Sequence, residues 1–300
     1  MVCWLDLRAP GTGIRPVIRF NPTMHRSPRS ITIRDIETIP EMREVEALQQ
    51  EVWGVDDREI FPALALIPMR EVGGILIGAF AGDRMAGFVF GFPGHENGRL
   101  ILHSDMLAVR PEYRSLGLGY RLKLAQRKRA LEKGIDTITW TFDPLQALNA
   151  RLNFGKLGVT ANRYCANYYG ETTSFLHQTG TDRLWVTWSL DSQRVRDRIA
   201  GGGEVPNHFA SDISALVRVG RDREPIREPQ AQLNPTATAI EIPDDINRML
   251  RDDIHSAIRW REATRHAFME AMAAGYVVED FCLVARAGQS VGVYLLTLQR

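Results

Sequence analysis

The sequence predicts an α+β fold with a mixed, mostly antiparallel sheet flanked by helices in three layers, followed by a smaller C-terminal α+β unit. Short apolar runs with β-strand alternation recur through residues 30–190, and segments with helical apolar spacing separate them. After Asp191 the composition shifts to Gly- and Pro-rich stretches around one long amphipathic segment. We therefore expect three parts: an irregular leader (1–29), a first domain (30–191) and an extension (192–300).

The leader has prolines at 10, 16, 22 and 28 and no sustained period, which is typical of an irregular tail. Met24 lies near its end and is an alternative start to Met1. Regular structure is expected from Ser30 onward.

The first domain is predicted to begin with a strand (30–36), a helix (39–53) and a second helical stretch (58–73) broken at Pro62 and Pro68. Two β-rich runs (74–84 and 85–94) are expected to form a hairpin that turns at Asp83 and Arg84, after Gly82. The elements expected next are a strand at 100–109, a helix ending near Gly134, a strand at 135–142, a short helix at 144–158, and strands at 159–170 and 183–190.

The extension is expected to contain two linkers, GGGEVPN (201–207) and REPIREPQAQLNPTA (223–237). An amphipathic helix (244–275) and two β-like runs (277–285 and 291–298) complete a unit that packs on the first domain.

The net charge of the 300-residue chain is +1, which gives no argument for nucleic acid or a membrane as a partner. No apolar run approaches the roughly 18 residues that span a bilayer, and the N-terminus is a poor signal peptide. Cys3, Cys165 and Cys282 are scattered, which favours a reducing, cytoplasmic compartment over a disulfide framework. Neither CxxC nor HExxH spacing occurs, so no metal site is expected.

The stretch VRPEYRSLGLGYRL (109–122) places two glycines between a strand and a basic helix. It lacks the GxxxxGK[ST] spacing of a nucleotide-binding P-loop and the third glycine of a dinucleotide fingerprint. What remains is Arg114-x-x-Gly117-x-Gly119 at the start of a helix. Backbone N–H groups at a helix N-terminus favour a phosphate group, so we expect a pyrophosphate there.

The segment MLAVRPEYRSLGLGYRLKLAQRKRALEKG resembles the R/Q-x-x-G-x-G/A motif of the GNAT superfamily of acyl-CoA-dependent N-acyltransferases, and the element order over 30–190 is similar to the GNAT fold. The resemblance implies acetyl-CoA or another acyl-CoA as co-substrate, without a metal. It assigns the pyrophosphate to the backbone of Leu116, Gly117, Leu118, Gly119 and Tyr120. It assigns the pantetheine to the strand edge at Leu107, Ala108 and Val109, and the outer phosphates to Lys123.

In GNAT enzymes an amine attacks the thioester directly, which requires a base, oxyanion donors and an acid for the leaving thiolate. His103 and Asp105 lie two apart on the predicted strand and share a face if it is regular. They are the candidate catalytic residues, with a satisfied His–Asp pair or a substrate-binding acid as the alternative.

The residue that would protonate the leaving thiolate departs from the family pattern. In ALNARLNFGKLGV the position that is often Tyr in GNAT proteins holds Phe154, which has no proton to donate. Three tyrosines on the next strand offer a hydroxyl: Tyr164, Tyr168 and Tyr169. Asn149 and Asn153 lie four apart on the predicted helix and are expected to contact pantetheine or substrate.

The resulting hypothesis is an N-acyltransferase that moves an acetyl or other short acyl group, including succinyl, to a primary amine such as an amino acid. Three arginines are candidates for binding an amino-acid carboxylate: Arg163, Arg261 and Arg265. The alternatives are a catalytically decayed GNAT that binds acyl-CoA as a sensor and a modifier of protein N-termini. We expect a small-molecule amine as partner and allow a homodimer.

Overall fold

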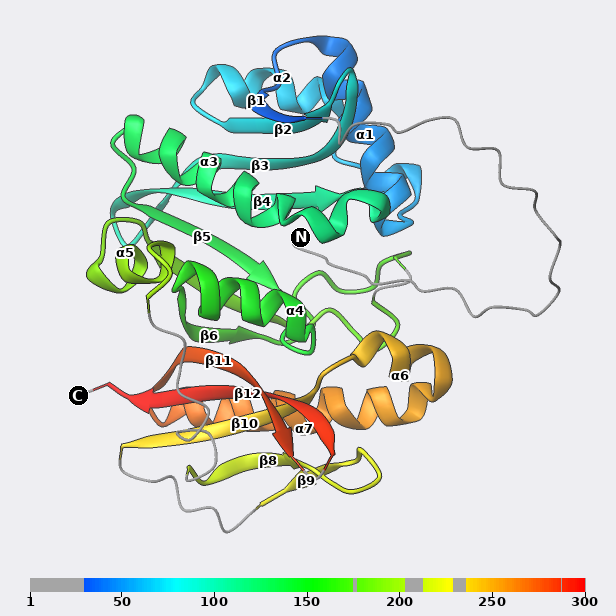
Figure 1. The fold of residues 1–300 in the computed structure, drawn as a ribbon, viewed down its shortest axis with the longest axis vertical. Coiled ribbons are helices and arrows are strands. Elements are labelled where there is room, and N and C mark those ends of the chain that lie inside the picture. Colours follow the sequence, from blue (N-terminus) through cyan, green and yellow to red (C-terminus); the bar gives the residue numbers. More distant parts are fainter. Residues whose placement is uncertain (1–29, 175–176, 203–212, 229–235, 287, 300) are drawn as a thin grey trace, which may run out of the picture.

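The computed structural model describes residues 30–174, 177–202, 213–228, 236–286 and 288–299. The predicted leader (1–29) and most of the first predicted linker, from residue 203 on, lie outside these ranges. Figure 1 shows the described part as a long sheet with helices on its faces.

The first half of the sheet has the strand order β1-β2-β3-β4-β5-β7-β6. These strands are β1 (Ile31–Asp35), β2 (Ile75–Ala81), β3 (Arg84–Glu96), β4 (Arg99–Val109), β5 (Thr137–Phe142), β6 (Thr160–Cys165) and β7 (Arg183–Ser189). The pair β4–β5 is parallel and the other neighbours in this half are antiparallel. The predicted mixed, mostly antiparallel sheet is therefore confirmed, including the hairpin of β2 and β3. Its turn lies one residue earlier than predicted, at Gly82 and Asp83, because Arg84 already pairs with Ala81.

Helices α1 (Ile39–Trp53) and α2 (Ala63–Glu71) cover one face of this half. Thr38 caps α1 and forms a reciprocal capping box with Glu41. The predicted break at Pro62 occurs, after the short turn η1 (Asp57–Glu59). The predicted break at Pro68 is wrong: Pro68 lies inside α2, which buried Leu66 anchors on the sheet.

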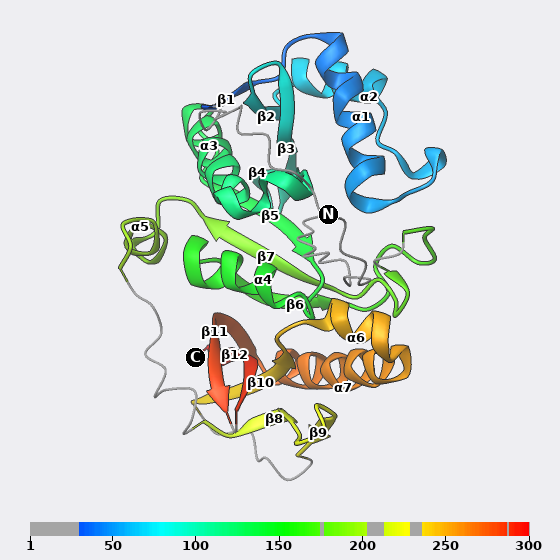
Figure 2. The same ribbon diagram turned by 45° about the vertical axis from the view of Figure 1, so that its right-hand side comes forward.

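Helices α3 (Leu118–Glu132) and α4 (Ala147–Ala150) cover the opposite face, so the first half has three layers (Figure 2). The predicted helix over 144–158 is present as α4 and a continuing π-helix, η3 (Arg151–Leu157), which ends at Gly158 in the left-handed conformation. A short helix, α5 (Gln193–Ile199), follows β7 and packs near η3.

The C-terminal unit continues the same sheet in the order β6-β11-β12-β10-β8-β9. Its strands are β8 (Ala215–Val219), β9 (Pro225–Arg227), β10 (Ala237–Pro243), β11 (Tyr276–Arg286) and β12 (Gln289–Leu298). Val278 of β11 pairs with Ala161 of β6, which joins the halves. The sequence did not predict β8. The predicted linker 223–237 is wrong at Pro225–Arg227, because this segment pairs with β8 as strand β9.

The predicted helix over 244–275 is divided into α6 (Ile246–Asp252) and α7 (Ile254–Ala273). Asp253 interrupts it with a non-helical backbone, and its side chain caps α7 by accepting from the Ser256 N–H. One apolar core runs from Trp140 and Phe154 in the first half to Trp260 and Tyr294 in the C-terminal unit. The division at Asp191 stays a prediction.

Candidate functional site

The glycine-containing loop lies at the N-terminus of α3. A 3₁₀ turn, η2 (Pro111–Leu116), leads into Gly117, which caps α3 with φ +66°. A Cβ at Gly117 would meet nothing within 4 Å, so the space in front of the helix is open. The first N–H groups of a helix have no intrahelical acceptor, and glycine has no side chain to cap them. This end of α3 can therefore receive an anion.

The neighbouring residues of the motif hold this loop in place. The Nε atom of Arg114 donates to the Val109 carbonyl at 3.2 Å and ties the 3₁₀ turn back to the end of β4. Leu118 and Gly119 are buried, Tyr120 is half-buried, and Leu116 is exposed. The five residues from Leu116 to Tyr120 thus present their backbone at the start of α3, while Leu118 anchors the helix in the core.

The edge of β4 that faces β5 is open beyond its first residues. β4 pairs with β5 at Leu102 and His103, and within the described strands the pairing ends there. Leu107, Ala108 and Val109 pair with β3 on the other side. A bulge also interrupts the β3 pairing, because Ser104 and Asp105 together lie opposite Gly91. Backbone groups of β4 are therefore available between the diverging strands, as the pantetheine prediction requires.

His103 is packed at the point where β4 and β5 diverge. Its Nδ1 lies 3.1 Å from the Thr139 hydroxyl on β5, and its ring lies against Phe92 and Trp185. Burial lowers the pKa of His103 to about 4, although the charge of Asp105 opposes this shift. The imidazole is therefore neutral at physiological pH.

Asp105 lines a cleft of about 410 Å³ beside this point. The cleft lies between the α1–α2 connection, β4 and the β6–β7 connection. Its other lining residues include the carboxylates Glu59 and Glu171 and the aromatic rings of Trp53, Phe61 and Tyr169. His103 is not among the lining residues, so only Asp105 of the predicted pair faces the cleft. Its described lining contains no lysine or arginine.

The structure contradicts the prediction for Lys123. Its side chain is 1% exposed, and its Nζ donates to Ser104 Oγ at 2.9 Å and to Gln126 Oε1 at 3.1 Å. The ammonium group also lies 3.6 Å from the centroid of the Trp140 ring. Burial holds the pKa of Lys123 well below its usual value. Lys123 therefore faces the sheet under α3 and not the exposed surface on which the prediction placed it.

Comparison with known proteins relates the part of the chain that contains α3 and β4 to a protein family. Residues 39–158 match the model of the acetyltransferase (GNAT) family. This part of the chain belongs to the GNAT family. Family members are acyl-CoA-dependent N-acyltransferases, so the chain carries an acetyltransferase domain whose co-substrate is an acyl-CoA. A search of curated proteins gave no match.

Several solved structures of GNAT acetyltransferases are similar to part of this chain at low sequence identity. The Escherichia coli ribosomal-protein-S18-alanine N-acetyltransferase is 16% identical, with a TM-score of 0.43, and the match covers 54% of this chain and 96% of that protein. A GNAT acetyltransferase from Streptococcus pneumoniae is 17% identical, with a TM-score of 0.43 over 53% of this chain and 98% of that one. Aminoglycoside 6'-acetyltransferase type Ii is 19% identical, with a TM-score of 0.42, and the match covers 54% of this chain and 99% of that one.

The helix that often carries the GNAT tyrosine is altered here. Phe154 is fully buried, with its ring against Phe142 of β5 and Tyr294 of β12. Asn149 and Asn153 are also fully buried, so the predicted contacts of these side chains are not on an open surface. Neither amide atom of Asn153 has a hydrogen-bond partner among the described residues. The roles of both asparagines toward pantetheine stay predictions.

The structure separates the three tyrosines offered as proton donors. The Tyr164 hydroxyl donates to Asp182 at 2.6 Å and is committed to that carboxylate. Tyr168 is outside the residues that line the cleft, whereas Tyr169 lines it. The hydroxyls of Tyr169 and Thr141 on β5 lie 3.2 Å apart. Tyr169 is therefore the tyrosine of this set placed between β5 and the cleft.

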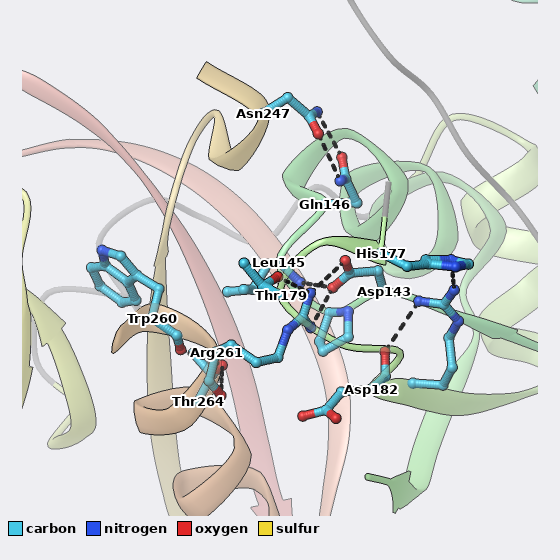
Figure 3. A network of polar contacts seen from close by, with 12 residues as sticks. Asp143, Leu145, Gln146, His177, Thr179, Asp182, Asn247, Trp260, Arg261 and Thr264 are labelled. Carbon is cyan, nitrogen blue, oxygen red and sulfur yellow. Dashed lines mark hydrogen bonds and ion pairs between the residues drawn. The ribbon is translucent and has the colours of Figure 1, made fainter. Parts of the chain in front are cut away.

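Two of the arginines expected to bind a substrate carboxylate are already paired. Both terminal nitrogens of Arg261 bind Asp143 at 2.7 Å (Figure 3). Arg265 binds Asp182 through two hydrogen bonds of 2.7 Å. Arg163 lies over the Trp185 ring, at 4.3 Å from its centroid. None of these arginines lines the cleft. The hypothesis of an amino-acid acceptor therefore lacks the cation expected to bind the carboxylate.

The sequence did not single out most cleft residues. Glu59 comes from the α1–α2 connection and Glu171 from the β6–β7 connection, and neither lies in a motif of fixed spacing. Among the described residues no cluster of three or more His, Cys, Asp or Glu is placed to hold a metal ion. No helix in these ranges is long and apolar enough to cross a membrane.

Proposed function

We propose that this protein is an N-acyltransferase that moves a short acyl group from acyl-CoA to a primary amine carrying further positive charge. The observation that carries the proposal is the position of Asp105: it lies on β4 beside the open strand edge and lines an acidic cleft. The acyl donor and the amine then approach β4 from adjoining spaces. Both bind before the C–N bond forms and the C–S bond breaks.

The residues at α3 and β4 fit acyl-CoA. The uncapped helix end at Gly117 offers N–H groups to the pyrophosphate, and the free edge of β4 at Leu107 to Val109 offers backbone groups to the pantetheine amides. The co-substrate supplies the activated acyl group as a thioester. The protein supplies alignment and the proton transfers.

The lining of the cleft favours a cationic acceptor. Glu59, Asp105 and Glu171 contribute negative charge, and the exposed ring of Tyr169 offers an aromatic face on which an ammonium group can lie. A carboxylate in the same space would meet only like charges. A polyamine or an aminoglycoside therefore fits better than a free amino acid.

The proton transfers are assigned to residues at the cleft. Asp105 holds the acceptor ammonium and takes up its proton, and neutral His103 lies beside it on the same strand. Tyr169 gives a proton to the departing thiolate, since its hydroxyl reaches β5 at Thr141. Partial burial raises the pKa of Tyr169, so the hydroxyl is protonated at neutral pH.

Thiol release from acetyl-CoA and succinyl-CoA, followed with a chromogenic thiol reagent, tests the proposal. The acceptors are spermidine, aminoglycosides, and L- and D-amino acids, with acceptor-free controls. Turnover with spermidine or aminoglycosides, and its loss in Asp105→Asn, is expected. CoA binding in calorimetry without turnover for any amine would favour the acyl-CoA sensor.

A further inference from the structure

The β6–β7 connection forms one wall of the acidic cleft. The residues that line the cleft from this side are Tyr169, Glu171, Thr172 and His177. The connection also touches the opposite wall: the Thr173 N–H donates to Glu59 Oε1 at 2.7 Å. The position of this wall therefore determines the width of the cleft.

The base of this wall is held by a buried carboxylate. Asp182 is 0% exposed and accepts four hydrogen bonds. Tyr164 donates its hydroxyl at 2.6 Å and Asn167 its backbone N–H at 2.8 Å. Nε and Nη2 of Arg265 donate the other two at 2.7 Å. Burial alone would raise the pKa of Asp182, but the hydrogen bonds from Arg265, Tyr164 and Asn167 together outweigh burial, and the pKa is lowered.

Two arginines from α7 of the C-terminal unit reach this region. Arg261 and Arg265 are one helical turn apart and extend toward the first half of the sheet. Arg261 binds Asp143 at the end of β5 and also donates to the Thr179 hydroxyl at 3.4 Å (Figure 3). Helix α7 therefore contacts the β6–β7 connection at two points, Thr179 and Asp182.

Hydrogen bonds lead from this base to the cleft. Arg183 donates to the Asp182 carbonyl at 3.2 Å and to His177 Nε2 at 2.6 Å. With Nε2 accepting, Nδ1 of His177 carries the proton and lies 2.5 Å from the Thr172 hydroxyl. Next to Asp182, the hydroxyl of Thr181 accepts from the Tyr169 N–H at 3.1 Å.

We propose that α7 sets the geometry of the acceptor cleft through the Arg265–Asp182 pair, so that Arg265 is a positioning residue for amine binding. The role of the cleft rests on the proposed function; the anchoring of the wall does not. The C-terminal unit thereby acts on acceptor binding through its helix, without contributing a residue to the cleft lining.

Hydrogen exchange of the full-length protein, followed by mass spectrometry, tests the anchoring. Arg265→Gln keeps a polar side chain and removes the charged fork, and Arg265→Lys keeps the charge. The control is Arg259→Gln, an exposed position on the same helix. Residues 166–174 and 177–182 are expected to exchange at least 10-fold faster in Arg265→Gln and to an intermediate extent in Arg265→Lys. Exchange equal to the Arg259→Gln control would overturn the proposal.

Kinetics with spermidine separate positioning from general destabilisation. We expect Arg265→Gln to raise the apparent KM for spermidine at least 10-fold, with kcat within about threefold and the Kd for acetyl-CoA unchanged. Faster exchange with an unchanged KM, or an equal loss of acetyl-CoA binding, would contradict a role in amine binding. Failure of the proposed function shows separately, as no acylation by the unsubstituted protein, and the exchange result then decides the anchoring.

Discussion

Substitution of Gly117 tests the assignment of the helix α3 end to the CoA pyrophosphate. Gly117 has φ +66°, where an L-residue is strained by roughly 1–2 kcal/mol. A side chain there meets no protein atom within 4 Å of its Cβ, so the strain is the main cost to folding. A carboxylate at a helix N-terminus returns about 0.3–1 kcal/mol. Gly117→Glu should therefore fold, with a Tm lower by a few degrees.

The effect of Gly117→Glu on CoA binding should be much larger. Two phosphate charges at about 5 Å from the new carboxylate, in an effective dielectric constant between 40 and 80, repel it by roughly 2–3 kcal/mol. This corresponds to a 30- to 150-fold weaker Kd in isothermal titration calorimetry, by about 1.4 kcal/mol per tenfold.

Gly82 provides the matched control for this substitution. It also has φ +66° with nothing within 4 Å of a built Cβ, but it lies in the β2–β3 turn. Gly82→Glu should lower the Tm by a similar amount and leave the Kd for CoA unchanged. An unchanged Kd in Gly117→Glu would refute the assignment of the pyrophosphate to this helix end.

Three further substitutions test the proton donor, the packing around Phe154 and the burial of His103. Tyr169→Phe should lower kcat about 10- to 100-fold with acetyl-CoA, whereas Tyr168→Phe, outside the cleft lining, should not; equal rates would exclude Tyr169 as the proton donor. Phe154→Tyr should give no gain in kcat and cost about 1–3 kcal/mol in urea unfolding, because a hydroxyl would enter a fully buried aromatic cluster; a faster enzyme would contradict this packing. Folding lowers the pKa of His103 from 6.5 to about 4, so its contribution to stability is full above pH 6.5 and is lost as the pH falls toward 4. His103→Gln should remove up to about 3 kcal/mol of this acid destabilisation, measured by urea unfolding between pH 4 and 7, and an unchanged pH dependence would be the opposing result.

Local patterns were sufficient to predict the first half of the sheet. Apolar, β-rich runs located β2, β3 and β4, and the glycine loop located the start of α3, because these signals lie within a few consecutive residues. The strands of the C-terminal extension were harder to predict. Strand β9 has only three residues and contains a proline at its start, so composition favoured a linker.

The side-chain predictions failed where long-range packing decides. Lys123 lies among basic residues on α3, which suggested a solvent-facing cation, yet its side chain turns under the helix toward Trp140. Arg261 and Arg265 had the right charge for a substrate carboxylate. Their partners, Asp143 and Asp182, are about 80 to 120 residues away in the sequence, and no spacing rule connects them.

Product analysis with acetyl-CoA and spermidine tests the central claim most directly. Thiol release and N-acetylspermidine, quantified in the same reaction by absorbance and mass spectrometry, should rise in equal amounts and depend on both substrates. Release of thiol without acetylated amine, or no release while CoA binds, would contradict the assignment of this protein as an acyltransferase for cationic amines.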